Sequence, residues 1–388
     1  MTKPEHRERA TKIFQAMRET AVPGETPEPT TVGAIPAATP SSGATSSEPP
    51  HFDDVGHLGN PGPLDSPRDG PTTELLPPLA ADAVSRPAAI KGPSREPSAQ
   101  APIDFQHLRS ASEELLAVHD LGVLPVDRLP LPRVLAIANQ KGGVGKTTTA
   151  VNLGAALAEL GYRILVVDLD PQGNATTGLG VNARNLESSV YDVILHDVPI
   201  EDCIEPTNLR NLFLVPATID LAGAEIELVP AFSRELRLKR AIDSILDDFD
   251  FVLIDCPPSL GLLTVNALAA AHEVAVPIQC EYYALEGLGQ LLRNIERVRA
   301  NLNPSLTVTT IIMTMFDART RLAEQVVAEV RSHFGERVCR SVVPRTVRLS
   351  EAPSFGQPII VFDPTSRGAT AYRELAREVS GGAPQRVG

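Results

Sequence analysis

The sequence has no hydrophobic run of the roughly 18 residues that a helix needs to cross a lipid bilayer. Its first 20 residues are charged and lack the apolar stretch of a secretion signal. We therefore expect neither a membrane-spanning segment nor export, and we predict a cytoplasmic protein.

Cysteine is scarce and scattered. The sequence contains four cysteines, far apart and without a C-x-x-C pair, at Cys203, Cys256, Cys280 and Cys339. Disulfide frameworks and cysteine-bound metals depend on closely spaced sets of cysteines. The pattern argues against both and predicts buried, reduced thiols.

Basic residues are fewer than acidic ones, 35 against 48, which gives the chain a formal net charge of −13. Spread evenly, such a charge argues against binding to nucleic acid. Residues 319–348 depart from this average, because they hold seven arginines and three glutamates, a local balance of +4. Arginine suits phosphate because its planar guanidinium donates two parallel hydrogen bonds. This stretch is a candidate anion-binding surface, and the alternative is a solvated helix face with local ion pairs.

Proline separates an extension from the rest of the chain. Residues 1–132 contain 21 of the 35 prolines and are rich in Gly, Ser, Thr and Ala. Such a segment buries too little apolar surface to offset its loss of entropy on folding. We predict a largely disordered extension at 1–132, with 20–102 as its least ordered part, a folded domain at 133–380 and a flexible tail at 381–388.

Two pieces of the extension have apolar residues at helical spacing. The segment 4–20 contains Ile13, Phe14 and Met17, and the segment 105–122 contains Leu108, Leu115, Leu116 and Val118. This spacing predicts short helices that dock on a partner or on the folded domain.

From residue 133 onward, short apolar runs alternate with helical stretches. The runs are RVLAIAN, RILVVDLD, NLFLVPA, DFVLIDC, EVAVPIQ, TVTTIIMTM and RSVVP, and the helix candidates include TTTAVNLGAALAELG and LEGLGQLLRNIERVRANL. Continuous apolar runs are typical of strands buried on both faces. The pattern predicts an α/β fold with a doubly wound, mainly parallel sheet flanked by helices. Ligands in such folds bind beyond the carboxyl ends of the strands.

The stretch NQKGGVGKTTTA, residues 139–150, follows the first of these strand runs directly. A glycine-rich turn before a helix lets backbone amides approach a phosphate, and the helix dipole favours the negative charge. The order G-K-T predicts that Lys146 neutralises the β- and γ-phosphates and that Thr147 ligates Mg²⁺. Gln140 stands where the common motif has glycine, and nucleotide binding within one subunit gives Lys141 no task.

The stretch K-G-G-V-G-K-T resembles the phosphate loop of the deviant Walker A ATPases, and within them the ParA/Soj chromosome- and plasmid-partitioning proteins. The resemblance covers roughly residues 133–380. It implies a P-loop NTPase that binds ATP and Mg²⁺ and forms an ATP-dependent, nucleotide-sandwich homodimer, in which Lys146 acts in its own subunit and Lys141 reaches the phosphates of the other. The implied nucleotide contacts are Lys141, Gly142, Gly143, Val144, Gly145, Lys146, Thr147 and Thr148.

Two further motifs supply carboxylates. In ILVVDLDPQGNAT, Asp168 ends a strand and Asp170 lies in the following turn, where a carboxylate can orient water for in-line attack on a phosphate. The resemblance assigns hydrolysis to Asp170, beside Lys141 and Lys146. In FVLIDCPPSLG, Asp255 matches the Walker B carboxylate that holds Mg²⁺ through water, and Gly261 lets the next loop sense the γ-phosphate. The alternative for each aspartate is a structural role as a cap or turn residue.

The segment that begins VVPRTVRLSEAP at residue 342 resembles the carboxyl-terminal signature of the same family. The resemblance places Pro344 and Thr346 beside the adenine, with threonine where the family usually has asparagine. It also implies that the ATP-bound dimer binds DNA without sequence preference through a basic surface. Arg319 and Arg348 lie in the matching segments.

Several related functions fit less well. A MinD-like regulator normally ends in an amphipathic membrane-binding helix, unlike REVSGGAPQRVG. Iron–sulfur carriers need paired cysteines, and a related tyrosine kinase has a tyrosine-rich tail, whereas Tyr372 stands alone near this terminus. We therefore predict a nucleoid-associated partition ATPase without a membrane partner, released from DNA when a ParB-like centromere-binding protein stimulates its slow hydrolysis. A MinD-like or polar-positioning regulator and an ATP-binding scaffold with little turnover are the alternatives.

Overall fold

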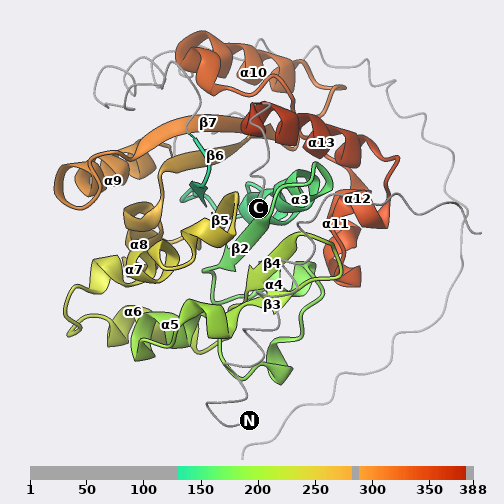
Figure 1. Cartoon of the computed structure of the whole chain (residues 1–388). Coiled ribbons are helices and arrows are strands. Elements are labelled where there is room, and N and C mark those ends of the chain that lie inside the picture. Colours follow the sequence, from blue (N-terminus) through green and yellow to red (C-terminus); the bar gives the residue numbers. More distant parts are fainter. Residues whose placement is uncertain (1–129, 282–287, 382–388) are drawn as a thin grey trace, which may run out of the picture. The chain divides into compact units, whose positions relative to one another are not determined.

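Strands and helices alternate from residue 133 onward in a computed structural model of the chain (Figure 1). The structure describes residues 130–281 and 288–381. The helices predicted at 4–20 and 105–122, the disorder predicted for 20–102 and the tail predicted beyond Gly381 lie outside the described residues.

One sheet runs through the described residues. Its strands are β1 (Arg133–Ile137), β2 (Ile164–Asp168), β3 (Glu205–Pro206), β4 (Leu212–Val215), β5 (Phe251–Asp255), β6 (Glu273–Gln279) and β7 (Thr307–Thr314). They lie in the order β3-β4-β2-β5-β1-β6-β7. Only the β3–β4 pair is antiparallel within this sheet. The carboxyl ends of β1, β2, β5, β6 and β7 therefore meet at one edge.

Helices connect these strands. The α-helices are α3 (Lys146–Glu159), α4 (Asn174–Gly178), α5 (Val190–His196), α6 (Leu221–Glu227), α7 (Arg237–Asp243), α8 (Leu262–Ala270), α9 (Leu288–Asn301), α10 (Arg321–Phe334), α11 (Val347–Glu351), α12 (Ile359–Phe362) and α13 (Arg367–Ser380). Short 3-10 turns are η1 (Ala183–Asn185), η2 (Ile200–Cys203), η3 (Arg234–Leu236), η4 (Leu246–Asp248), η5 (Gly335–Arg337) and η6 (Ala352–Phe355). No helix in the described part of the chain combines the length and the apolar character that crossing a bilayer requires.

The central strands are apolar along their whole length because both faces of the sheet are covered. Every residue of β1, β2 and β5 is buried. Val134 and Ala136 of β1 belong to one hydrophobic cluster, and Leu135 and Ile137 belong to another. Alternate side chains of a strand point to opposite faces, so each position of a doubly covered strand has to be apolar.

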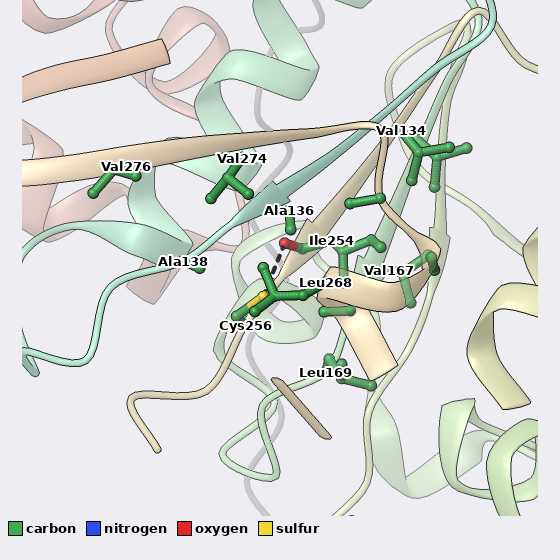
Figure 2. Close-up of a cluster of buried hydrophobic side chains, with 14 of the residues drawn as sticks. Val134, Ala136, Ala138, Val167, Leu169, Ile254, Cys256, Leu268, Val274 and Val276 are labelled. Atoms are coloured by element: carbon green, nitrogen blue, oxygen red, sulfur yellow. Dashed lines mark hydrogen bonds between the residues drawn. The ribbon is translucent and has the colours of Figure 1, made fainter. Parts of the chain in front are cut away.

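Helices cover both faces of the sheet. Figure 2 shows part of one cluster, which β1, β2, β5 and β6 share with α8; further side chains in it come from α5, α6, α7, α9 and α10. The other cluster takes side chains from α3, α4, α11, α12 and α13. The predicted α/β class with a doubly wound, mainly parallel sheet is confirmed.

Hydrogen bonds and an ion pair from α12, α13 and β6 hold α3 and β1 in place. The side-chain oxygen of Asn152 on α3 accepts a hydrogen bond of 2.6 Å from the backbone N–H of Ile359. Arg133 on β1 donates to both carboxylate oxygens of Glu273 on β6, at 2.5 and 2.8 Å, and to the carbonyl oxygen of Val379 on α13. Breaking such a buried ion pair by removing one partner typically costs about 3–5 kcal/mol. These contacts hold the amino end of β1 firmly.

The structure tests two further predictions, one about the cysteines and one about the apolar run at 340–344. All four cysteines are buried and free, as predicted. The run RSVVP at 340–344 was predicted as a strand and this is wrong, because it makes only an isolated bridge between Pro344 and Phe316. Pro344 has no N–H to donate, and Met315 adopts a left-handed φ of 52° that interrupts the ladder beyond β7.

Candidate nucleotide-binding site

The loop between β1 and α3 forms an open backbone cradle at the carboxyl edge of the sheet. Gly143 and Gly145 adopt φ values of 74° and 91°, which side chains rarely tolerate. A Cβ atom placed on Gly142 or Gly143 would meet no atom within 4 Å. The hydroxyl of Thr314 at the end of β7 donates a 2.8 Å hydrogen bond to the carbonyl oxygen of Val144 and fixes the loop from behind. The loop is anchored on one side and open on the other.

The amino end of α3 is suited to an anion. Helix α3 begins at Lys146 and has no acidic residue in its first turn. The first N–H groups of a helix lack partners within it and carry a partial positive charge. The half-buried Thr147 and Thr148 belong to this turn. The arrangement can bind phosphate oxygens without charge repulsion.

Lys146 is a nearly buried cation, with 7% of its surface exposed. Its Nζ donates a hydrogen bond of 3.3 Å to the carbonyl oxygen of Lys141. Burial lowers the pKa of Lys146, and the charge of Asp255 is the first of the groups that oppose this shift. A desolvated ammonium group gains most from a strong anion, because charge interactions are stronger in a low-dielectric site.

Asp255 is fully buried at the end of β5, and neither of its carboxylate oxygens has a hydrogen-bond partner among the described residues. Burial and then the charge of Asp168 raise the pKa of Asp255 well above its ordinary value, whereas the nearby Thr147 hydroxyl and Lys146 lower it. A buried carboxylate without donors is unfavourable. This unsatisfied pair of oxygens beside Thr147 fits a bound cation.

The donor set points to Mg²⁺ rather than to a metal held by the protein alone. The described residues contain no group of three or more His, Cys, Asp or Glu side chains that suits a metal ion. Mg²⁺ usually takes one or two protein ligands, with the rest supplied by water and substrate phosphates. Thr147 and Asp255 match that pattern.

Asp168 and Asp170 have different surroundings. Asp168 is fully buried and accepts from the N–H and hydroxyl of Thr176 at 2.8 and 2.7 Å and from the N–H of Asp170 at 3.2 Å. Asp170 uses one oxygen to accept from the N–H of Gln172 at 3.0 Å. Asp168 therefore holds the loop that carries Asp170, the structural role that the sequence left as its alternative. No hydrogen bond within the described residues engages the second oxygen of Asp170.

Lys141 lies at the rim of the cradle. Its side chain is 36% exposed, and its Nζ lies 3.8 Å from a carboxylate oxygen of Glu281. Its backbone N–H donates to the side-chain oxygen of Asn139, whose amide donates to the carbonyl oxygen of Pro277. The backbone of Lys141 is thus tied to β6, while its ammonium group lies near Glu281 and is partly exposed.

Pro344 and Thr346 lie next to β7, on the side where Thr314 supports the cradle. Backbone hydrogen bonds of 3.0 Å join Phe316 to Val343 and Arg345. Pro344 is buried, and the hydroxyl of Thr346 caps α11 by accepting from the N–H of Leu349. The segment lies beside the carboxyl end of β7, and its contact with the adenine stays a prediction.

Arg319 and Arg348 are exposed but paired. The side chain of Arg319 is 88% exposed and donates twice to Asp317, at 2.6 and 2.9 Å. Arg348 is 58% exposed and pairs with Glu351 and Asp363 at 3.2 and 3.4 Å. Exposed pairs of this kind contribute little stability and exchange readily for other partners. Whether the two arginines bind DNA stays a prediction.

Sequence motifs missed the residues that support the site. Thr176 donates a hydrogen bond to Asp168, and Thr314 donates one to the carbonyl oxygen of Val144. Asn139 accepts a hydrogen bond from the backbone of Lys141, and Glu281 pairs with the side chain of Lys141. Thr314 lies 170 residues from Val144 along the chain, so no local pattern links them. The sequence could have indicated these residues only through their positions at or near the carboxyl ends of parallel strands, which meet at one edge of the sheet.

These features define a class of protein. A doubly wound parallel sheet, a glycine-rich loop that opens a helix, and a lysine and carboxylate at the same edge are typical of P-loop nucleotide-binding proteins. In agreement, a family model described as an AAA domain matches residues 132–308.

Known proteins place the chain more narrowly. The sporulation initiation inhibitor protein Soj of Bacillus subtilis is 57% identical over 248 residues, which cover 64% of this chain and 98% of that protein. The chromosome partitioning protein ParA of Caulobacter vibrioides is 54% identical over 249 residues, covering 64% and 93%. The chain therefore belongs to the ParA/Soj family of chromosome-partitioning ATPases, as its motifs predicted.

Two solved structures resemble the folded part of this chain. A protein of Mycobacterium smegmatis described as cobyrinic acid a,c-diamide synthase, with bound ADP and magnesium, is 44% identical, with a TM-score of 0.57 and coverage of 65% of this chain and 97% of that one. The septum site-determining protein MinD of Pyrococcus horikoshii, complexed with Mg-ADP, is 28% identical, with a TM-score of 0.51 and coverage of 64% and 95%.

Proposed function

We propose that the chain binds ATP with Mg²⁺ in the cradle between β1 and α3 and hydrolyses it as a partition ATPase. The observation that carries this proposal is the fully buried Asp255, whose two oxygens lack hydrogen-bond partners among the described residues, beside Thr147 and the desolvated Lys146. Bound ADP and magnesium in a 44% identical structure support the same ligands here.

Each residue has a defined task in this proposal. The amides from Gly142 to Thr148 and the Nζ of Lys146 bind the phosphates, and Thr147 and Asp255 hold Mg²⁺, the latter through water. When bound, Mg²⁺ neutralises charge on the phosphate oxygens. Asp170 orients the attacking water with its free oxygen, and Asp168 positions the loop that carries it.

We further propose that ATP draws two copies together and that the dimer binds DNA. The side chain of Lys141 is partly exposed at the rim of the cradle and has only a loose pairing with Glu281, at 3.8 Å, which supports a role at the phosphates of a second copy. Arg319, in the turn after β7, and Arg348, on α11, are both exposed and would exchange their carboxylate partners for DNA phosphates. A ParB-like partner would then stimulate hydrolysis and release the dimer from the nucleoid.

Nucleotide binding by Lys146→Ala tests the core of the proposal. Because this substitution removes the phosphate counter-charge, we expect ATP affinity to fall at least about tenfold, or about 1.4 kcal/mol. Lys239→Ala on α7 is the matched control, since that lysine is exposed and pairs only with Asp243 in the described structure. Affinity of the Lys146 variant within threefold of wild type would remove the cradle as the site.

Turnover separates the proposed enzyme from a scaffold. Single-turnover hydrolysis is measured with and without DNA, and we expect a slow basal rate that DNA increases. ATP binding without release of phosphate under either condition would favour the scaffold instead.

A further inference from the structure

An exposed apolar surface lies on α6 and on the turns just before and after it. Ile219, Ile226, Val229 and Phe232 expose 70%, 78%, 57% and 87% of their surface. Steps of seven and three residues along a helical segment place the first three side chains on one side. The opposite side of α6 is packed in the core through Leu221, Ala224 and Leu228. We refer to the four exposed residues as the α6 surface.

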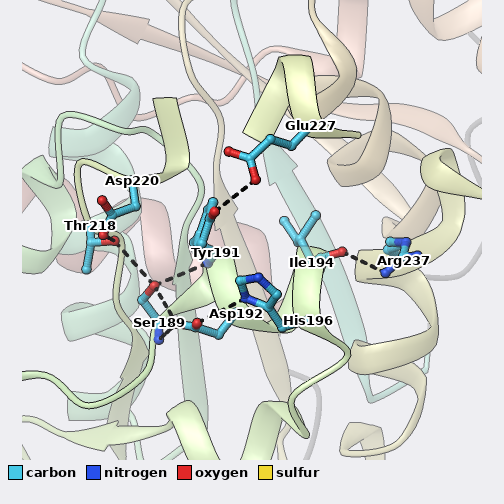
Figure 3. Close-up of polar contacts among 9 residues, drawn as sticks. All are labelled: Ser189, Tyr191, Asp192, Ile194, His196, Thr218, Asp220, Glu227 and Arg237. Carbon is cyan, nitrogen blue, oxygen red and sulfur yellow. Dashed lines mark hydrogen bonds and ion pairs between the residues drawn. The ribbon is translucent and has the colours of Figure 1, made fainter. Parts of the chain in front are cut away.

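Acidic groups surround the α6 surface. Residues 218–236 contain Asp220, Glu225, Glu227 and Glu235 but only one basic residue, Arg234, which is paired with Glu235. Figure 3 shows that Glu227 accepts a hydrogen bond from the hydroxyl of Tyr191 on α5, at 3.0 Å. Asp220 accepts a hydrogen bond of 3.3 Å from the hydroxyl of Thr218. The carboxylates are therefore held at the rim of an apolar face, a combination that suits a basic amphipathic partner.

The α6 surface is also linked to the nucleotide site. The hydroxyl of Ser259, in the loop that follows Asp255, donates a 3.4 Å hydrogen bond to Glu225. A Cβ atom on Gly261 would lie 1.8 Å from the same carboxylate oxygen, so α6 lies directly against this loop. An occupant of the α6 surface would touch an element that contacts the loop after the Mg²⁺-binding strand.

We propose that residues 3–20 of this chain bind the α6 surface. Ala10, Ile13, Phe14 and Met17 are spaced i, i+3, i+4 and i+7, which predicts one apolar face of a helix. Residues 3–20 contain five basic and three acidic side chains, a net charge of +2, whereas residues 218–236 have a net charge of −3. The other segment with helical spacing, 105–122, has a net charge of −2 and would be repelled. Charge therefore selects the first segment.

The connecting chain is long enough for this contact. Residues 21–129 separate the segment from the first described residue. With the disorder that its composition predicts, a chain of this length would have a root-mean-square span of roughly 50–60 Å, more than the reach needed across one domain. Its length keeps the segment at an effective concentration on the order of 1 mM. The contact would be modest in strength and readily displaced by a competing partner.

This inference goes beyond the family and does not rest on the proposed function. The match to Soj of Bacillus subtilis uses 64% of this chain and 98% of that protein, so a segment of this kind has no counterpart there. The family model likewise begins at residue 132.

Hydrogen–deuterium exchange of the full chain without nucleotide tests the contact from both sides. In Ile13→Asp/Phe14→Asp, we expect peptides that cover 219–232 to exchange at least about tenfold faster than in wild type. In Ile226→Asp/Phe232→Asp, we expect the same acceleration in peptides that cover 3–20. Because both substituted pairs are predicted or observed to lie on a surface, the fold should tolerate them.

Phe355→Asp is the matched control, since Phe355 is 65% exposed in another part of the surface. It should leave exchange in both regions unchanged. Protection that is independent of protein concentration supports an intramolecular contact. Unchanged exchange in the two double variants overturns the proposal, and so does protection that disappears on dilution, which would identify a second copy as the occupant. Protection of 219–232 that appears only when another protein is added would likewise assign the surface to that protein.

Discussion

Asp168 makes the stability of the nucleotide-free protein depend on pH. Burial raises its pKa to about 6, against the opposing hydrogen bonds from Thr176 and Asp170. The ordinary value in an unfolded chain is about 3.9. A carboxyl group with a raised pKa binds its proton more tightly in the folded state, so its contribution to stability is lost as the pH rises from the unfolded to the folded value. A difference of about two units corresponds to a loss of about 3 kcal/mol at neutral pH.

Asp168→Asn retains an oxygen that accepts from Thr176 and removes the ionisation. We expect the free energy of unfolding of wild type, minus that of the variant, to fall by about 2 kcal/mol between pH 4 and pH 7.5, with roughly half of the fall above pH 5. Urea unfolding at closely spaced pH values measures this difference. Asp243→Asn, on the exposed side of α7, controls for the loss of any carboxylate. Parallel pH profiles for wild type and the Asp168 variant would show that folding does not shift the pKa of this carboxyl group.

Three further outcomes follow from the site and its surface. Asp170→Ala should bind ATP, form the dimer and remain on DNA without turnover, and hydrolysis at the wild-type rate would remove Asp170 from the mechanism. In Asp255→Asn, the thermal stabilisation by ATP should no longer increase with Mg²⁺; for wild type at a ligand concentration of 100 times Kd it amounts to about 2.7 kcal/mol. Arg319→Ala or Arg348→Ala should weaken binding equally on every duplex and reduce the slope of log K against log salt by about 2 in a symmetric dimer. Unchanged slopes in both variants would place the DNA surface elsewhere.

The fold was readable from sequence because its strands are buried on both faces. Runs such as ILVVD in β2 and FVLID in β5 are apolar up to their last residue, which is the aspartate that lies at the site. RSVVP looked similar but failed as a strand, because the run is short and Pro344 cannot donate to a ladder beside β7. Composition identifies an apolar segment more reliably than it identifies regular pairing.

The site was readable only where its residues are adjacent in sequence. The cradle is one continuous stretch, so Lys146 and Thr147 could be predicted together. Thr314 and Glu281 reach the same cradle from β7 and from the end of β6, and only the order of the strands brings them there. The pairing of Arg319 with Asp317 was also hidden, although the two are close in sequence, because a count of charges does not show which ones are bonded.

The central claim is that ATP bound in one subunit is completed by Lys141 of a second. Sedimentation velocity with Mg²⁺ and a non-hydrolysed ATP analogue tests it most directly, on wild type, Lys141→Ala and Lys146→Ala. We predict a dimer for wild type only, with analogue affinity largely retained in Lys141→Ala and lost in Lys146→Ala. A full dimer of Lys141→Ala would contradict the account, since the lysine at the rim of the cradle would then have no part in joining the two copies.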